Sequence, residues 1–197
     1  MQNLFNKGRK ARARLIEVAR RVSGAHIGGS FSIIDFLITY YSKVSPDKVE
    51  EKLEFYKGKL ISDYPTLVFS KGHCYLAQLA ALDIVFNQDY YCDNYLKEDT
   101  QFFGHPKRIK DNIHFPISAG ALGQGLTFGN GLSLADKLIG NNQKTISIIG
   151  DGEMNEGSCT EALVFACQHK LNHCFVIDNN NQISLGKTSD IYNLGNL

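Results

Sequence analysis

The chain has 197 residues, enough for one α/β domain with its own hydrophobic core but short for two, so we predict a single domain over residues 1–197. Hydrophobic residues make up 43% and charged residues 21% of the sequence, a composition that is typical of a soluble globular protein and excludes a disordered one. The formal net charge of +1 provides no general attraction for nucleic acid or for an anionic membrane, so any anion must be bound by a local arrangement of groups.

Cysteine usage and the amino-terminal segment bear on the compartment. The five cysteines contain no C-x-x-C pair, which argues against a disulfide framework and against a zinc site. The amino-terminus is basic but continues as an amphipathic helix without an apolar signal core, and no later stretch approaches membrane-spanning length. We therefore predict reduced thiols, a cytoplasmic location, and no membrane or nucleic-acid partner. The basic run Lys7–Arg14 is interpreted as a solvated helix face.

Hydrophobic periodicity predicts helices in the first part of the chain. Leu15, Val18, Ala19 and Val22 are spaced for one face of the first helix. Further helices are predicted over Ile33–Tyr41, Tyr75–Val85 and Gly123–Leu138. The last of these contains small residues at helical spacing, which indicates close packing against a neighbour.

The last third of the chain predicts a βαβ unit. Thr145–Ile149 and Cys174–Ile177 are apolar runs typical of buried strands, and Cys159–His169 between them is helical in pattern. Such a unit implies an α/β fold with a parallel sheet flanked by helices and a right-handed crossover. Ligands of such sheets bind beyond the carboxyl ends of the strands, where loops 150–157 and 178–184 lie.

The first of these loops has the composition of a phosphate site. Gly150 and Gly152 let backbone N–H groups approach a phosphate, and the helix that follows adds a favourable dipole. Asp151 would repel that phosphate unless a cation lay between them, which indicates Mg²⁺ bridging a diphosphate. The second strand ends in Asp178 and Asn179–Asn181, whose short oxygen-bearing side chains suit a hard cation. Taken singly, each segment is equally well explained as a tight turn or a strand cap; together they favour a metal site.

Five motifs, in order along the chain, resemble those of transketolases. HIGGSFS (His26–Ser32) is similar to the family's H-P-G-G-S-x-S, and FSKGH (Phe69–His73) to its L-S-K-G-H. GHP (Gly104–Pro106) and GALGQG (Gly120–Gly125) fit as well. The sequence GDGEMNEGSCTEA, followed by NNNQIS, resembles the thiamine-diphosphate motif that opens with GDG and closes with an asparagine pair. The resemblance covers nearly all of the chain and implies the diphosphate-binding domain of a thiamine-diphosphate enzyme.

The resemblance assigns cofactor roles to particular residues. It implies that Mg²⁺ is ligated by the side chains of Asp151 and Asn181 and by the backbone carbonyl of Ile183. Gly152 is expected to offer its backbone to the diphosphate of thiamine diphosphate, and His73 to contact the same group.

The resemblance also assigns the rings of the cofactor and the catalytic groups. Gly120 and Leu122 are expected to line the pocket for the aminopyrimidine and thiazolium rings. His26 and His105 resemble the substrate histidines, which hydrogen-bond sugar hydroxyl groups and move protons as the carbon chain is cleaved. Glu156 resembles a family glutamate in a network that crosses the interface between active sites.

Other candidate side chains are interpreted as structural or surface residues. His114, His169 and His173 match no motif and are interpreted as packed or surface residues. Lys71 is equally compatible with a phosphate ligand and with a structural position. Cys74 is interpreted as a buried thiol, because no base accompanies it.

The resemblance also implies what this chain lacks. Thiamine-diphosphate enzymes activate the cofactor with a glutamate that, in transketolases, lies on a separate pyrimidine-binding domain. We therefore expect a C-terminal transketolase subunit to supply that domain, the chain alone to be inactive, and two copies of each chain to assemble. Family members continue past Ser184–Leu197, so the domain is expected to be shortened at its C-terminus. Smaller departures are Ile27 and Ala121 in place of the usual prolines, and an extra Ala25 before His26.

The expected function is therefore that of the N-terminal subunit of a two-subunit transketolase, which transfers a two-carbon ketol unit between a ketose phosphate and an aldose. Two alternatives stay open: another thiamine-diphosphate reaction, of synthase or decarboxylase type, and a noncatalytic homologue that serves as a binding subunit. A nucleotide-binding fold of the Rossmann type is disfavoured, because no G-x-G-x-x-G follows a strand. Central pentose metabolism and the synthesis of an unusual surface sugar are equally compatible with the sequence.

Overall fold

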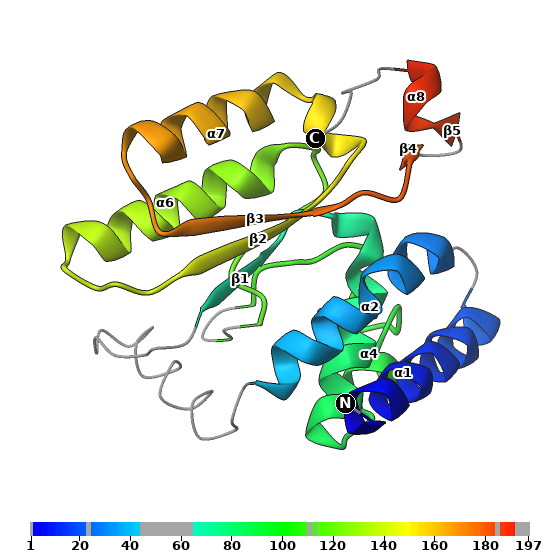
Figure 1. Cartoon of the computed structure of the whole chain (residues 1–197). Coiled ribbons are helices and arrows are strands. Elements are labelled where there is room, and N and C mark those ends of the chain that lie inside the picture. Colours follow the sequence, from blue (N-terminus) through cyan, green and yellow to red (C-terminus); the bar gives the residue numbers. More distant parts are fainter. Residues whose placement is uncertain are drawn as a thin grey trace.

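A parallel sheet of three strands, in the order β1-β2-β3, lies at the centre of the structure (Figure 1). The computed structural model describes residues 2–22, 25–43, 65–109, 112, 114–183 and 186–191. β1 (Thr66–Phe69) and β3 (His173–Asp178) each pair in parallel with β2 (Thr145–Gly150). Gly150 lies opposite Asp178 in the register, so the carboxyl ends of β2 and β3 meet at one edge of the sheet.

Helices cover the sheet from both sides (Figure 1). α6 (Gln124–Leu138) and α7 (Gly157–Gln168) lie along one face. On the other side, α1 (Gln2–Arg21), α2 (Ile27–Ser42) and α4 (Tyr75–Phe86) pack against one another. None of the described helices is both long enough and apolar enough to cross a membrane.

Alternation along β2 explains why the sheet has two cores. Ile148 belongs to the large cluster of buried side chains from α1, α2 and α4. The next residue, Ile149, points to the opposite face and packs in a second cluster with Leu126 of α6 and Cys159 of α7. Successive side chains of a strand point to opposite faces, so one apolar strand joins both cores.

Short elements connect these layers. They are η1 (Gly72–Cys74), α5 (Tyr90–Asp93), η2 (Glu153–Asn155), the hairpin of β4 (Gln182–Ile183) with β5 (Gly186–Lys187), and α8 (Thr188–Ile191). Three of them, η1, η2 and the hairpin, directly follow strands β1, β2 and β3 in the chain. The elements that carry the sequence motifs therefore gather at the carboxyl ends of the sheet.

Glycines bring α6 unusually close to the sheet. A Cβ atom on Gly129 would lie 2.4 Å from Cε1 of His173, and one on Gly125 would lie 2.2 Å from Cβ of Ser70. Neither position can hold a side chain without moving the helix. The predicted close packing through small residues is confirmed, and so is the βαβ unit formed by β2, α7 and β3.

Two features differ from the sequence-based expectations. β1 was not expected, because its four residues are all buried and therefore show neither alternation nor helical spacing. The interpretation of Lys7–Arg14 as a solvated face is wrong for Arg14, whereas Arg12 lies in an exposed ion pair. Arg12 donates to Asp35 of α2 at 2.8 and 2.7 Å, and Arg14, whose side chain is only 11% exposed, pairs with Asp93 of α5 at 2.6 Å. These arginines bind the first helix to its neighbours.

Candidate functional site

Three histidines from separate segments come together beside the carboxyl end of β1. His26 directly precedes α2, His73 lies in η1, and His105 lies in the loop before α6. The ring centroid of His26 lies 5.9 Å from that of His73 and 6.4 Å from that of His105. The two residues expected to act on substrate and the one expected to contact diphosphate therefore form one cluster.

Glycines of the same motifs let the histidine rings pack against the backbone. A Cβ atom on Gly72 would lie 2.8 Å from Cδ2 of His105. One on Gly29 would lie 3.1 Å from the ring of His73. These glycines are therefore required by close approach, since both have ordinary backbone angles.

Two of these histidines have lowered pKa values, which favours their neutral forms at pH 7. Burial lowers the pKa of His73 to about 4, and the neighbouring Lys71, His26 and His105 lower it further. His105 is an exposed residue, and partial desolvation, followed by His26, lowers its pKa. A neutral imidazole has one donor and one acceptor nitrogen, so both rings can hydrogen-bond hydroxyl or phosphate oxygens and can accept a proton.

Beneath the cluster, Lys71 forms a buried polar network. Its side chain is 1% exposed, and its ammonium group forms an ion pair with Asp178 and donates to Oγ of Ser32 at 3.2 Å. The Ser32 hydroxyl in turn donates to Oδ2 of Asp178 at 2.6 Å. The network joins α2 and the ends of β1 and β3, which favours the structural interpretation of Lys71. Cys74 beside it is buried, as expected, and burial raises its pKa to about 12.

The predicted metal ligands lie together at the ends of β2 and β3. Asp151 is 3% exposed, and its Oδ2 accepts a hydrogen bond from Oγ1 of Thr188 at 2.7 Å. The backbone N–H of Thr188 donates to the carbonyl of Asn181 at 3.2 Å. A Cβ atom on Gly152 would lie 2.7 Å from Cγ1 of Ile183. The β4–β5 hairpin is therefore folded against the Gly-Asp-Gly turn.

These residues fit the chemistry of a hard cation. Asp151, Asn181 and Ile183 provide a carboxylate, an amide and a backbone carbonyl, all oxygen donors of the kind that Mg²⁺ prefers. Asn181 has a φ of 57°, in the left-handed region that asparagine tolerates better than most residues. Among the residues that the structure describes, no three His, Cys, Asp or Glu side chains gather as a metal cluster. The expected set contains only one such side chain, with diphosphate and water oxygens as the other ligands.

The remaining predicted residues lie on the surface. Gly120, Leu122 and Glu156 are all exposed, Leu122 to 46%. Gly120 lies beside His105, since a Cβ atom there would be 3.8 Å from its ring. A Cβ atom on Gly123 would be 3.0 Å from that of Glu156. The residues expected to meet the cofactor rings and the interface therefore face outward from the same end of the sheet.

Sequence reasoning missed Glu153, which is 4% exposed. Its Oε1 accepts hydrogen bonds from Oγ of Ser70 at 2.6 Å and from the backbone N–H of Gly123 at 2.8 Å. The sequence alone does not distinguish it, because it is one of three glutamates in GDGEMNEGSCTEA. Only the fold shows that Glu153 is buried and that Glu156 and Glu161 are exposed.

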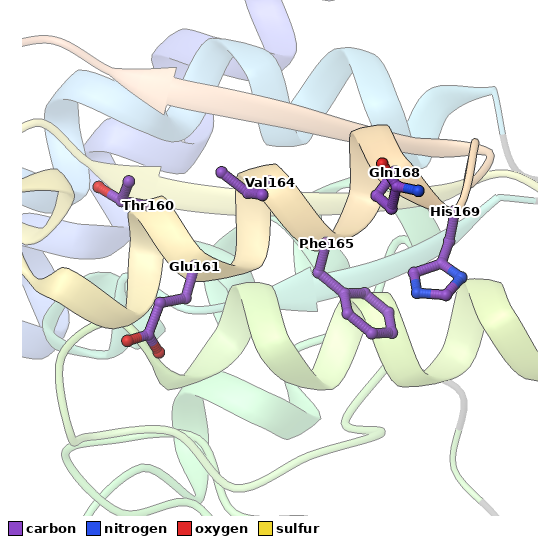
Figure 2. A pocket seen from close by; sticks show the side chains of 6 residues that line it. All are labelled: Thr160, Glu161, Val164, Phe165, Gln168 and His169. Carbon is purple, nitrogen blue, oxygen red and sulfur yellow. The ribbon is translucent and has the colours of Figure 1, made fainter.

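A hollow on the outer face of α7 does not belong to this site. It has a volume of about 440 Å³, and Figure 2 shows the side chains that line it. They are Thr160, Glu161, Val164, Phe165, Gln168 and His169. None was expected to act in catalysis, and the ring of His169 lies against that of Phe165, tilted by 38°, with 4.2 Å between ring centroids. His169 is exposed and His114 is buried among aromatic rings, which agrees with their interpretation as surface or packed residues.

Known proteins are similar in sequence to this chain, including over the segments that form the site. Residues 90–192, more than half of the chain, match the family described as 1-deoxy-D-xylulose-5-phosphate synthase. One subunit of the apulose-4-phosphate transketolase of Phocaeicola vulgatus is 30% identical over 194 residues, which cover 96% of this chain and 65% of that protein. The protein of the same name from Actinobacillus succinogenes is 29% identical, with 95% and 66% covered. A 6-deoxy-6-sulfo-D-fructose transketolase subunit from a Clostridium species is 27% identical, with 96% and 66% covered.

The chain thus spans about two thirds of the length of these relatives. The family match includes the GHP, GALGQG, GDG and NNNQIS motifs, and the transketolase relatives extend the similarity over the two earlier motifs. The chain belongs to the transketolase family of thiamine-diphosphate enzymes, together with 1-deoxy-D-xylulose-5-phosphate synthase.

Proposed function

We propose that the chain is the N-terminal subunit of a two-subunit transketolase, which transfers a two-carbon ketol unit from a ketose phosphate to an aldose. The observation that supports this most is the cluster of His26, His73 and His105, assembled from three motifs at one end of the sheet. The cluster lies at the same end as Asp151, to which it is linked through Lys71 and the end of β3.

The oxygen donors at the strand ends suit a magnesium diphosphate. Asp151, Asn181 and Ile183 would hold Mg²⁺, and the backbone of Gly152 would meet the diphosphate. His73 would donate a hydrogen bond to the same group, because a neutral ring with a pKa of about 4 keeps one N–H donor at pH 7. When bound, thiamine diphosphate supplies a nucleophilic carbon and an electron sink for cleaving the bond beside a ketose carbonyl.

His26 and His105 would act on the sugar. His105 is exposed and has a lowered pKa, so at neutral pH one of its nitrogens can accept a proton from a substrate hydroxyl. The ring centroid of His26 lies 6.4 Å from that of His105, so His26 would bind a second hydroxyl group of the same sugar. Two imidazoles so placed can hold a polyhydroxylated substrate and move a proton as its carbon–carbon bond breaks.

A partner subunit would complete the active site. Relatives whose names describe one subunit of a transketolase support a division of the enzyme between two chains. The partner would carry the pyrimidine-binding domain with its activating glutamate, and Glu156 would join a network across the interface. Gly120 and Leu122 are exposed in the chain alone, as residues lining one wall of a shared cleft would be.

A synthase reaction on a 2-oxo acid is the second candidate. The match of residues 90–192 to a family named for a synthase supports it. The two reactions are distinguished by offering the mixed subunits either a ketose phosphate or a 2-oxo acid as donor.

The cofactor site can be tested by calorimetry. Thiamine diphosphate is titrated into the chain with and without Mg²⁺, and the titration is repeated with Asp151→Ala. We expect binding that requires Mg²⁺ and that weakens at least ~10-fold in the variant, because loss of a charged ligand typically costs more than ~1.4 kcal/mol.

The matched control is Asp89→Ala, since that carboxylate is 77% exposed and lies on the α1–α5 side of the molecule. It should bind like the wild type. Binding that is insensitive to Asp151 would contradict the proposed metal site. No binding under any condition, with the partner present, would favour the noncatalytic alternative.

A further inference from the structure

We propose that Glu153 is a positioning residue, which fixes the ring-contacting and diphosphate-contacting halves of the cofactor site relative to each other. The inference rests on the proposed function, because it concerns the same site. Glu153 itself has no expected contact with cofactor or substrate, and it is 4% exposed.

The carboxylate of Glu153 joins three segments that are far apart in the chain. Its Oε1 accepts hydrogen bonds from Ser70, directly after β1, at 2.6 Å and from the backbone of Gly123, before α6, at 2.8 Å. Its Oε2 lies 3.4 Å from the backbone nitrogen of Gly150, the last residue of β2. The Ser70 hydroxyl also accepts from the backbone N–H of Gly125 at 3.2 Å. Thus one side chain meets the SKGH, GALGQG and GDG motifs at once.

Glu153 and Ser70 together cap α6. No side chain of the helix's own N-cap residue, Gly123, can bind the first N–H groups of this 15-residue helix. Instead, Glu153 binds the N–H of Gly123, and Ser70 binds that of Gly125. A carboxylate is also favoured at the positive end of a helix dipole. The start of α6, and with it the loop that carries Gly120 and Leu122, is therefore held to η2.

The surroundings of Gly123 and Glu153 are closely packed. Gly123 has a φ of 77°, and a Cβ atom there would lie 2.1 Å from Oγ of Ser158. The Cys159 thiol donates to the carbonyl of Glu153 at 3.2 Å, which holds its backbone in place. A buried carboxylate is costly unless its oxygens are hydrogen-bonded, so the donors and Glu153 are mutually required.

The consequence is a fixed spacing across the cofactor cleft. Gly120 and Leu122, expected at the rings, lie on the α6 side of this junction. Asp151 and Gly152, expected at the metal and diphosphate, lie on the η2 side. A ligand that reaches both sides depends on their spacing. Inorganic diphosphate would meet Asp151, Gly152 and His73, and these are connected without Glu153 through Asp178, which pairs with Lys71 and accepts from the backbone N–H of Asp151.

The experiment compares thiamine diphosphate with inorganic diphosphate, both with Mg²⁺, on the 197-residue chain and on Glu153→Ala, each with and without the partner subunit. We expect the variant to bind thiamine diphosphate at least ~10-fold more weakly, and inorganic diphosphate within ~3-fold of wild type, because only the longer ligand spans the junction. Glu153→Gln keeps an oxygen acceptor for Ser70 and Gly123 and should restore most of the lost affinity.

Two further variants keep the inference open to contradiction. Glu161→Ala removes an exposed carboxylate of α7 and should change neither affinity. Ser70→Ala, which keeps Glu153, should show the same selective loss in smaller measure and serves if Glu153→Ala does not fold. Equal loss of both ligands, no loss of either, or no rescue by Glu153→Gln would overturn the positioning role and leave the proposed function intact. Absence of thiamine diphosphate binding in the wild type, with the partner subunit present, would instead remove the proposed function, and this inference with it.

Discussion

At the residue scale, His173 illustrates how burial determines a protonation state. The side-chain amide nitrogen of Asn130 donates to the carbonyl of Ala162, so its Oδ1 is the atom that faces Nδ1 of His173 at 2.8 Å. Nδ1 therefore carries the proton, and Nε2 accepts from the Ser147 hydroxyl at 2.7 Å. Burial lowers the pKa of His173 to about 4. The ring is neutral, and both of its nitrogens form hydrogen bonds that hold α6 to the sheet. This agrees with its interpretation as a packed residue.

This network predicts a specific acid sensitivity. Between pH 6.5 and about 4 the unfolded chain binds a proton at His173 that the folded chain does not, so stability falls as the pH falls through this window. The free energy of unfolding should decrease by up to ~1.4 kcal/mol per pH unit from this residue alone. Urea unfolding at pH 7, 6 and 5 measures the slope. His173→Gln should be less stable at pH 7 but less sensitive to acid; identical slopes for the two proteins would contradict the assignment.

At the scale of an element, α6 contains two nearby glycines with opposite expected effects. Gly129 faces His173 and Ser147 at distances that exclude a Cβ atom, whereas nothing lies within 4 Å of a Cβ atom on Gly131. Gly129→Ala should therefore destabilise the fold by ~1–3 kcal/mol through overpacking. Gly131→Ala should stabilise it by ~0.5–1 kcal/mol, because alanine is the better helix former. Chemical denaturation of the two variants measures both; a stabilising Gly129→Ala would contradict the close packing of α6.

At the scale of the whole molecule, the proposed partner has a measurable consequence. The chain has a mass of 22.0 kDa. Mixed with a partner that carries the pyrimidine-binding domain, and with thiamine diphosphate and Mg²⁺, it should form an assembly of two copies of each chain. Light scattering after size exclusion measures the mass. A mixture that elutes as separate monomers, with cofactor present, would contradict the shared active site.

The sequence predicts much of this architecture, and the limits are physical. Periodicity located the longer helices, because each buries one face, and the apolar runs Thr145–Ile149 and Cys174–Ile177 located β2 and β3. β1 was missed because its four buried residues are too short a run to distinguish a strand from a helix. The site histidines were found through their motifs, but Glu153 was not, since its role depends on donors from Ser70 and Gly123, 83 and 30 residues away. No local pattern reports such contacts.

The ion pair between Lys71 and Asp178 joins residues separated by 107 positions in the chain. Because both groups are almost fully enclosed, replacing either one leaves the other charge buried without a partner, typically at a cost of ~3–5 kcal/mol. Replacing both with apolar residues of similar volume carries no such penalty. Related proteins should therefore either have both residues or have neither. A relative in which one of the two is replaced should have a compensating replacement at the other position.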